Sequence, residues 1–134
     1  METSLKSTFD VIAFGAHPDD LEAVMGGTTV KLVRNGSSVV FVDLCDGEPT
    51  RHAARGERHK QAVKAVGILG VERATLTLQD RLITDSVEAR LQVARLLREH
   101  RPRMVFTTAG AVSTEIRSPP PFRAEENPHP SQER

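Results

Sequence analysis

The bulk composition limits what this chain can be. Its 134 residues are about the size of one compact domain, so a second domain is not expected. Lysine plus arginine and aspartate plus glutamate both number 18, which gives a formal net charge of zero. Because no basic field is then available to attract nucleic acid or an anionic membrane, we expect a small-molecule partner.

Cysteine usage and the absence of long apolar runs indicate the compartment. The single cysteine, Cys45, cannot form an internal disulfide, and its place at the end of an apolar strand is typical of a small core residue. Residues 1–6 lack the apolar core of a signal peptide, and no run approaches the ~20 apolar residues of a membrane span. The sequence predicts a soluble, cytoplasmic protein.

The first predicted unit is a buried strand followed by a helix. Residues 10–16 are almost wholly apolar, as in a strand covered on both faces of a parallel sheet. Asp19 and Asp20 then offer N-capping carboxylates, and a helical apolar pattern continues until Asn35. The residues expected to face inward from this helix are Leu21, Val24, Thr28, Leu32 and Val33.

A second unit repeats this order. Residues 38–44 have the buried-strand pattern, and the polar residues 46–50 predict a loop. Residues 57–69 predict a helix that Gly70 ends. Its expected inward residues are Ala62, Val63, Val66 and Leu69.

The third unit leads into a fourth strand. Residues 73–78 alternate as a short strand, and Asp85 with Glu88 resembles a capping box that opens a helix before Pro102. Residues 103–108 predict the last strand. Alternating strands and helices predict an α/β fold, a doubly wound parallel sheet of Rossmann-like, three-layer form with four strands.

The pattern ends after Thr108. Residues 109–134 contain three consecutive prolines and two more at Pro128 and Pro130, with no apolar period. Such a stretch cannot bury one face, so the domain is expected to span 1–108 and the rest to be an irregular or disordered tail.

Polar side chains follow every predicted strand. Because ligands bind at the carboxyl ends of the strands in an open parallel sheet, these side chains are expected at one edge. They are His17, Asp19 and Asp20 after strand one, Asp46 and Glu48 after strand two, Asp80 and Arg81 after strand three, and Thr107 and Thr108 in strand four.

The group after the first strand has the chemistry of a metal site. An imidazole and a carboxylate three residues apart can reach one cation, and nitrogen with oxygen suits Zn²⁺ or another divalent first-row metal. A catalytic metal lowers the pKa of its bound water from 15.7 to roughly 7, and a neighbouring carboxylate can take the proton. One division makes His17 and Asp20 the ligands and Asp19 the base; the alternative is that both aspartates merely cap the helix.

The run GAHPDDLEAVMGGTTVKL resembles the opening signature A-H-P-D-D-x-E of the LmbE-like, PIG-L-type deacetylases. The resemblance continues through DLCDGEPT and LQDR to REHRPRMVFTT, and so covers about residues 9–108. It implies a zinc-dependent hydrolase that removes an N-acetyl group from an N-acetylglucosamine-containing small molecule. The DRLITD segment resembles the branch of the family that acts in bacillithiol biosynthesis.

The family roles transfer by position in this sequence. The resemblance implies that His17 and Asp20 bind the metal, that Asp19 is the general base for a metal-bound water nucleophile, and that Glu48 and Arg58 line the sugar pocket. Asp80 either binds a sugar hydroxyl or caps a turn. The expected partner is a small-molecule amino-sugar conjugate, and a homo-oligomer stays open.

The chain departs from the family after the fourth strand. The family supplies a third ligand and an oxyanion-stabilising histidine from an H-P-D-H motif there, and this sequence has no such motif. The only later histidine is His129, and an alignment of that run with the motif places Gln132, a poor zinc ligand, at the ligand position. Two ligands hold zinc less tightly than three, so a catalytically dead fragment of the family is one alternative.

A receiver-like phosphoacceptor signalling domain is the other alternative. Paired acids after strand one, Asp80 after strand three and Thr107 or Thr108 in strand four match its placements, but a fifth strand ending in lysine is missing. A dinucleotide-binding module is disfavoured because the first strand-to-helix turn has no G-x-G-x-x-G.

Four further residues are expected to be structural. His59 and His100 are placed on charged helix faces and are not expected to be ligands. Gly26 and Gly27 lie inside the first helix, where each costs ~1 kcal/mol against alanine, so close packing or a local break is expected there.

Overall fold

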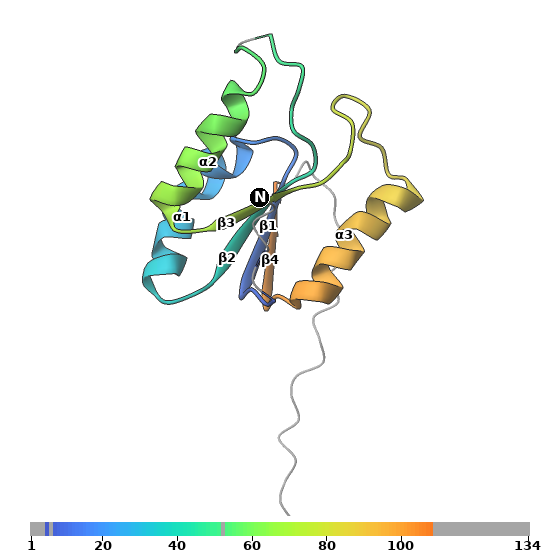
Figure 1. The fold of residues 1–134 in the computed structure, drawn as a ribbon. Helices are drawn as coiled ribbons and strands as arrows, with labels where there is room; N and C mark the ends of the chain where they lie inside the picture. The colour runs from blue at the N-terminus through green and yellow to red at the C-terminus, as the bar shows by residue number, and fades with distance from the viewer. Residues whose placement is uncertain (1–4, 6, 52, 109–134) are drawn as a thin grey trace, which may run out of the picture.

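Four parallel strands form the centre of the fold (Figure 1). In the computed structural model, residue 5, residues 7–51 and residues 53–108 are described. The strand order is β3-β2-β1-β4, with each neighbouring pair parallel. The strands are β1 (Val11–Gly15), β2 (Val39–Asp43), β3 (Glu72–Thr75) and β4 (Met104–Thr107).

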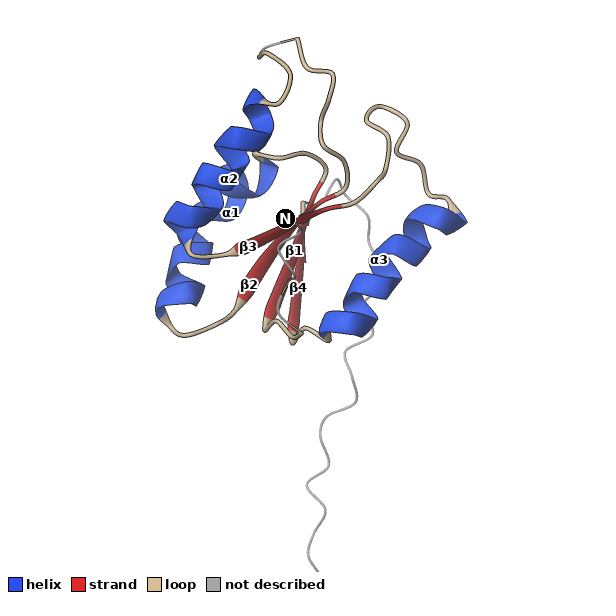
Figure 2. Ribbon diagram, in the orientation of Figure 1, coloured by secondary structure: helices blue, strands red, loops and turns tan. Residues whose placement is uncertain are grey.

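Helices cover both faces of this sheet (Figure 2). Helices α1 (Asp20–Arg34) and α2 (Glu57–Leu69) lie on one face, and α3 (Val87–His100) lies on the other. The prediction of a parallel, doubly wound, three-layer α/β fold with four strands is therefore confirmed.

The two central strands supply the core. Every residue of β1 and β2 is buried, as expected for strands covered on both faces. Alternate side chains point to opposite sides: Ala13 and Phe41 pack with α1, whereas Ile12 and Val40 pack toward residues of α3. The apolar runs that predicted these strands thus serve two cores at once.

The register brings the carboxyl ends of the strands to one edge. Gly15 of β1 pairs with Asp43 of β2, and Phe14 pairs with Thr107 of β4. The chain leaves β1 toward α1 on one face, whereas β4 is reached from α3 on the other. This reversal of winding between β1 and β4 is the topological switch point, where open α/β sheets bind ligands.

The buried face of α1 is rotated relative to the prediction. The inward residues are Leu21, Met25 and Thr29, spaced four apart, and Met25 joins the core beside β1. The expectations for Val24 and Thr28 were wrong, because Val24 is 67% exposed and Thr28 is exposed as well. Val63 of α2, also expected to face inward, is 54% exposed. Residues spaced four apart lie on one face of a helix, and so do residues spaced alternately three and four apart. Only packing against the sheet decides which of the two sets is buried.

The start of α3 differs from the predicted capping box. Ser86 is the N-cap, and its hydroxyl accepts a hydrogen bond from the Ala89 backbone N–H at 3.2 Å. Asp85 instead forms an ion pair of 2.6 Å with Arg90. The helix therefore begins one residue later than an Asp85 cap implies.

His100 was expected on a charged helix face and is instead buried, with 2% exposed. Its ring lies edge-on to Phe9, with 5.2 Å between the ring centroids. The Phe9 N–H also donates to the His100 carbonyl at 3.4 Å. The histidine thus packs where α3 meets the amino-terminal approach to β1, at the end of the sheet away from the predicted site.

The two glycines inside α1 have no packing reason among the described residues. A Cβ atom added at Gly26 or Gly27 meets nothing within 4 Å outside the helix backbone. Helix α1 also runs unbroken from Asp20 to Arg34. Both expectations, close packing and a local break, are wrong for the described structure.

None of the helices in the described ranges has both the length and the apolarity needed to cross a bilayer. The predicted irregular tail, residues 109–134, lies outside the described residues.

Candidate active site

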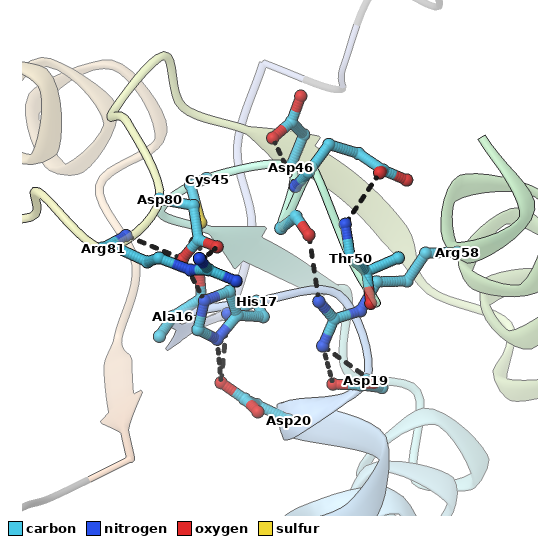
Figure 3. A network of polar contacts seen from close by, with 12 residues as sticks. Ala16, His17, Asp19, Asp20, Cys45, Asp46, Thr50, Arg58, Asp80 and Arg81 are labelled. Carbon is cyan, nitrogen blue, oxygen red and sulfur yellow. Dashed lines mark hydrogen bonds and ion pairs between the residues drawn. The ribbon is translucent and has the colours of Figure 1, made fainter. Parts of the chain in front are cut away.

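His17 is held between two carboxylates at the carboxyl edge of the sheet (Figure 3). Its Nε2 atom lies 2.7 Å from Asp80 Oδ1, and its Nδ1 atom lies 3.8 Å from Asp20 Oδ2. The two carboxylates come from different units of the fold, since Asp20 begins α1 and Asp80 follows β3. The imidazole side chain is 32% exposed, so this group is reachable from solvent.

Gly15 allows the chain to turn from β1 into α1 so closely. A Cβ atom at Gly15 would lie 3.0 Å from Leu21 Cγ and 3.3 Å from Asp20 Cβ. Only glycine leaves that space free without a shift of α1. The tight return places Asp20 so that its Oδ2 atom accepts a hydrogen bond from the His17 backbone N–H at 3.0 Å.

Neither aspartate of the pair caps α1 with its side chain. Asp19 is the N-cap residue by position, but its side chain makes no cap hydrogen bond, and its φ of 116° lies in the left-handed region. The Asp20 carboxylate bonds back to His17. The alternative that both aspartates merely cap the helix is therefore wrong.

Two sets of donor atoms at this edge could hold a metal ion. His17, Cys45 and Asp80 each offer one ligand atom, and these atoms lie within 4.8 Å of one another. The other set is the predicted one, Nδ1 of His17 with Oδ2 of Asp20. Both sets use the same imidazole, but they use opposite ring nitrogens.

Bond lengths favour the second set. Two atoms that each lie about 2.1 Å from one zinc ion are about 3.4 Å apart at the tetrahedral angle and at most about 4.2 Å apart. The 3.8 Å between Nδ1 and Asp20 Oδ2 falls in this range. The 2.7 Å between Nε2 and Asp80 Oδ1 is the length of a charge-assisted hydrogen bond.

Cys45 is placed as a thiol rather than as a metal-ligating thiolate. Its side chain is fully buried, and Sγ donates to the Ala16 carbonyl at 3.3 Å. Burial raises the pKa of the Cys45 thiol above its usual value, and the thiolate is the form that binds metals. The expectation of a small core residue is confirmed by its burial, although no sequence pattern indicated that it lies beside His17.

Asp80 is fixed by its neighbours as well as by His17. The Arg81 backbone N–H donates to Asp80 Oδ1 at 2.9 Å, and only 13% of the Asp80 side chain is exposed. The hydrogen bond with His17 lowers the pKa of Asp80 below its usual value, with further help from the Arg81 backbone bond. The carboxylate form therefore faces the imidazole. The predicted contact of Asp80 with a sugar hydroxyl stays a prediction.

Asp19 and Arg58 form a second pair next to this group (Figure 3). Arg58 Nη2 lies 3.1 Å and 3.3 Å from the two carboxylate oxygens of Asp19, and Nη1 donates to the Gly47 carbonyl at 3.2 Å. Gly47 has a φ of +71°, and a Cβ atom there would lie 2.5 Å from Arg58 Nη1. A glycine is thus needed for Arg58 to reach across to Asp19, whose side chain is 65% exposed.

Glu48 braces the loop that follows β2. Its two carboxylate oxygens accept hydrogen bonds from the backbone N–H groups of Thr50, at 3.3 Å, and of Gly56, at 3.2 Å. Glu48 also borders a cavity of about 230 Å³ together with Pro18 and His59. Its position beside the candidate site is consistent with its predicted role, and its contact with a sugar stays a prediction.

A larger groove opens on the other side of Asp20. It measures about 770 Å³ and lies between α1 and β4, at the switch point of the sheet. Its lining combines Asp20 with small and apolar residues of α1 and with the end of β4, including Phe106 and Thr107. The groove thus reaches the candidate site at Asp20.

A buried ion cluster near the candidate site was missed by the sequence analysis. Arg73 of β3 lies 2.7 Å from Glu22 Oε1 of α1 and 3.3 Å from Asp43 Oδ2 of β2, and its guanidinium lies 5.6 Å from the centre of the Phe41 ring. Asp43 has no exposed surface, and burial raises its pKa from 3.8 to about 6, although Arg73 opposes this shift. A charged residue inside the apolar run SVVFVDL was the available signal.

These features define an α/β protein with a candidate metal centre at the switch point of its sheet. The family model described as "PIG-L: GlcNAc-PI de-N-acetylase" matches residues 12–114. The chain therefore belongs to the PIG-L family, as its H-P-D-D signature predicted.

Two proteins named as deacetylases and one further structure are similar to the chain. Diacetylchitobiose deacetylase of Thermococcus kodakarensis is 30% identical over 104 residues, which are 72% of this chain and 39% of that protein. The conserved protein TT1542 of Thermus thermophilus is 36% identical, with a TM-score of 0.73 over 79% of this chain and 49% of that one. N,N'-diacetylchitobiose deacetylase of Pyrococcus horikoshii is 28% identical, with a TM-score of 0.65 over 79% of this chain and 43% of that one.

The chain spans less than half the length of these relatives. None of the three is named for bacillithiol biosynthesis, and assignment to that branch stays a prediction. The receiver-like alternative is wrong, because receiver sheets have the order 2-1-3-4-5, whereas β1 here lies between β2 and β4 and β3 is at the edge.

Proposed function

We propose that this chain supplies the catalytic edge of a metal-dependent amide hydrolase that removes an N-acetyl group from an amino-sugar conjugate. Family membership supports the reaction class. The observation that carries the proposal is the 3.8 Å separation of His17 Nδ1 and Asp20 Oδ2 at the switch point, because one divalent ion can bind both atoms.

The donor set fits Zn²⁺ or another divalent first-row metal. One imidazole nitrogen and one carboxylate oxygen are ligands that zinc accepts, and both side chains are about one third exposed, so an ion can enter. Among the described residues, no third histidine, cysteine or acid joins this pair within ligand distance. The remaining positions are left for solvent, substrate or a donor outside the described residues.

Each residue of the site has a separate proposed role. When bound, the metal ion supplies Lewis-acid activation of water and of the amide carbonyl. Asp19 accepts the proton of the attacking water and returns it to the leaving amine. Arg58 holds the Asp19 carboxylate in place through its two hydrogen bonds, and Glu48 fixes the loop that carries Gly47 toward Arg58.

The proposed partner is a small amino-sugar conjugate, with neither nucleic acid nor a membrane involved. The groove beside Asp20 gives room for the sugar, and its lining of Thr28, Thr107 and Thr108 offers hydroxyl groups for hydrogen bonds to sugar hydroxyls. The named substrates of the relatives, diacetylated chitobioses, belong to this chemical class. The proposal is compatible with either a monomer or a homo-oligomer.

A catalytically dead member of the family is the second candidate. It is favoured by one observation, namely that the described residues give the Nδ1 side of the site only two protein ligands. Such a chain would keep the sheet and bind the ion weakly or not at all.

Metal content and amine release together test the proposal. The full chain is loaded with Zn²⁺, passed through a desalting column and analysed for zinc, and free amine is then measured with N,N'-diacetylchitobiose. We expect about one zinc per chain, lost in His17→Ala and Asp20→Ala, and amine release that falls at least 100-fold in Asp19→Asn with zinc retained.

Asp85→Ala is the matched control for Asp20→Ala. It removes an exposed carboxylate that pairs with Arg90, and it should retain both zinc and activity. Zinc retained without amine release from any N-acetylated amino sugar would support the dead member, and zinc that survives in His17→Ala would overturn the proposed site.

A further inference from the structure

Asp80 touches the same imidazole as the proposed metal, but from the opposite side. The two ring nitrogens of a neutral histidine differ, because one carries a proton and the other a lone pair. Whichever nitrogen carries the proton cannot bind a metal ion. The contacts of Nε2 therefore decide what Nδ1 can do.

The hydrogen bonds around Asp80 Oδ1 fix this choice. A backbone N–H can only donate, so Oδ1 acts as an acceptor toward Arg81 N at 2.9 Å. The same oxygen lies 2.7 Å from His17 Nε2. Because the ionised carboxylate has no proton to donate, Nε2 must be the donor at this distance, and in the neutral ring the lone pair is then on Nδ1.

The backbone holds Asp80 at this position. Leu76 N–H donates to the Asp43 carbonyl at 2.8 Å, and Leu78 N–H donates to the Leu44 carbonyl at 3.3 Å, so the segment after β3 runs along the segment after β2. Asp80 is thereby brought beside Cys45, whose Sγ lies 3.9 Å from Oδ1. The backbone leading to Asp80 is thus hydrogen-bonded to the segment after β2 as far as Leu78.

We propose that Asp80 is a positioning residue, which keeps His17 in the Nε2–H form and aims the Nδ1 lone pair at an ion shared with Asp20. This inference rests on the proposed function for the identity of the bound group. It assigns the His17, Cys45 and Asp80 cluster to orientation of the ligand rather than to a second metal site. Hydrogen bonds of this kind typically contribute 10–100-fold to metal affinity.

The first experiment reads the tautomer without any metal. Long-range ¹H–¹⁵N correlation spectra of the metal-free full chain, at a pH where His17 is neutral, distinguish a protonated from an unprotonated ring nitrogen. We expect His17 to carry its proton on Nε2, and we expect a mixture of both tautomers in Asp80→Ala. A wild-type chain with the proton on Nδ1 would overturn the inference whether or not the chain binds metal.

The second experiment measures Zn²⁺ affinity by competition with a chelator. We expect Asp80→Ala to bind 10–100-fold more weakly than wild type, with a circular dichroism spectrum that is unchanged. Asp85→Ala is the matched control, since it removes an exposed carboxylate five residues further along the same segment and should leave the affinity unchanged. Equal affinity of Asp80→Ala and wild type, or complete loss as in His17→Ala, would contradict a positioning role.

Substitution with Co²⁺ separates the two donor sets directly. A cysteine thiolate bound to Co²⁺ gives an intense near-ultraviolet charge-transfer band, whereas nitrogen and oxygen ligands do not. We expect no such band, in wild type or in Cys45→Ser, and its presence in wild type alone would make Cys45 a ligand and overturn the inference. If no metal binds to wild type, the proposed function fails, and the tautomer measurement still decides the role of Asp80.

Discussion

Strands β2 and β4 flank the same central strand, yet their surroundings differ. Both pair with β1 in a parallel register over at least four residues. All of β2 is buried, with Phe41 and Val42 at 0% exposed, whereas Met104, Val105 and Phe106 of β4 are 36–49% exposed. Identical backbone pairing thus goes with opposite side-chain environments.

The difference follows from what lies beyond each strand. Outside β2 the sheet continues to β3, and α1, α2 and α3 cover both faces. Among the described residues, β4 is the outermost strand on its side. The candidate site lies between these two environments, because the Asp80 side of His17 is enclosed beside β2 whereas the Asp20 side opens into the groove toward β4.

Replacing one phenylalanine in each strand should give the largest difference in stability between β2 and β4. Phe41→Ala removes a fully buried ring and should lower the free energy of unfolding by about 3–5 kcal/mol, whereas Phe106→Ala should cost about 1 kcal/mol or less. Urea unfolding of the full chain measures both values. Equal costs would mean that β4 is as well covered in the whole protein as β2.

The buried carboxylate of β2 provides the next largest effect. The pKa of Asp43 is raised to about 6 in the folded chain by burial, so folding favours its protonated form. The stability from this group is therefore fully present below about pH 4 and is lost as pH rises through 6. A shift of this size corresponds to about 3 kcal/mol.

Asp43→Asn should remove this pH dependence. The difference in unfolding free energy between the variant and wild type should move in favour of the variant by about 2 kcal/mol between pH 4 and pH 7. Asp46→Asn, at an exposed position three residues further along, is the control for the loss of a carboxylate that is not buried. If the difference between Asp43→Asn and wild type does not change with pH, the attraction of Arg73 offsets the cost of burying the ionised Asp43 carboxylate.

Sequence patterns predicted the helices and strands of this fold because each pattern depends on neighbouring residues alone. The runs at 10–16 and 38–44 are apolar without alternation, and both became strands that are buried on two faces. The helix at 57–69 was predicted with the bounds that α2 has. Glycines and prolines supplied the ends of the helices.

The orientation of side chains could not be predicted in the same way. Val24 and Met25 are both apolar neighbours in α1, and only the position of the helix on the sheet decides that Met25 is buried. His100 looked like a surface residue beside Glu99 and Arg101, and its contact with Phe9 depends on a residue 91 positions away. Tertiary packing, which a one-dimensional pattern does not contain, decided both cases.

The candidate site shows the same division. The H-P-D-D run predicted His17, Asp19 and Asp20 as a group, and the structure places all three at one edge. The pairs Asp19–Arg58 and His17–Asp80 join residues 39 and 63 positions apart, and no local signal announced them. Sequence reasoning thus found the residues at the edge but not which of them contact one another.

The smallest effect concerns α1, the helix that borders the groove beside β4. At Gly27, an exposed position, an added methyl group meets nothing within 4 Å among the described residues. Gly27→Ala should therefore raise the free energy of unfolding by about 0.5–1 kcal/mol, because alanine loses less backbone entropy in a helix. Gly26→Ala should do the same, whereas Gly70→Ala, at a φ of +71° and 3.3 Å from Val33 Cγ1, should be destabilising. Urea unfolding measures the sign of each change. A loss of stability in Gly27→Ala would show that something packs closely on this face of α1 in the whole protein. The groove between α1 and β4 would then be covered by chain outside the described residues or by a second copy.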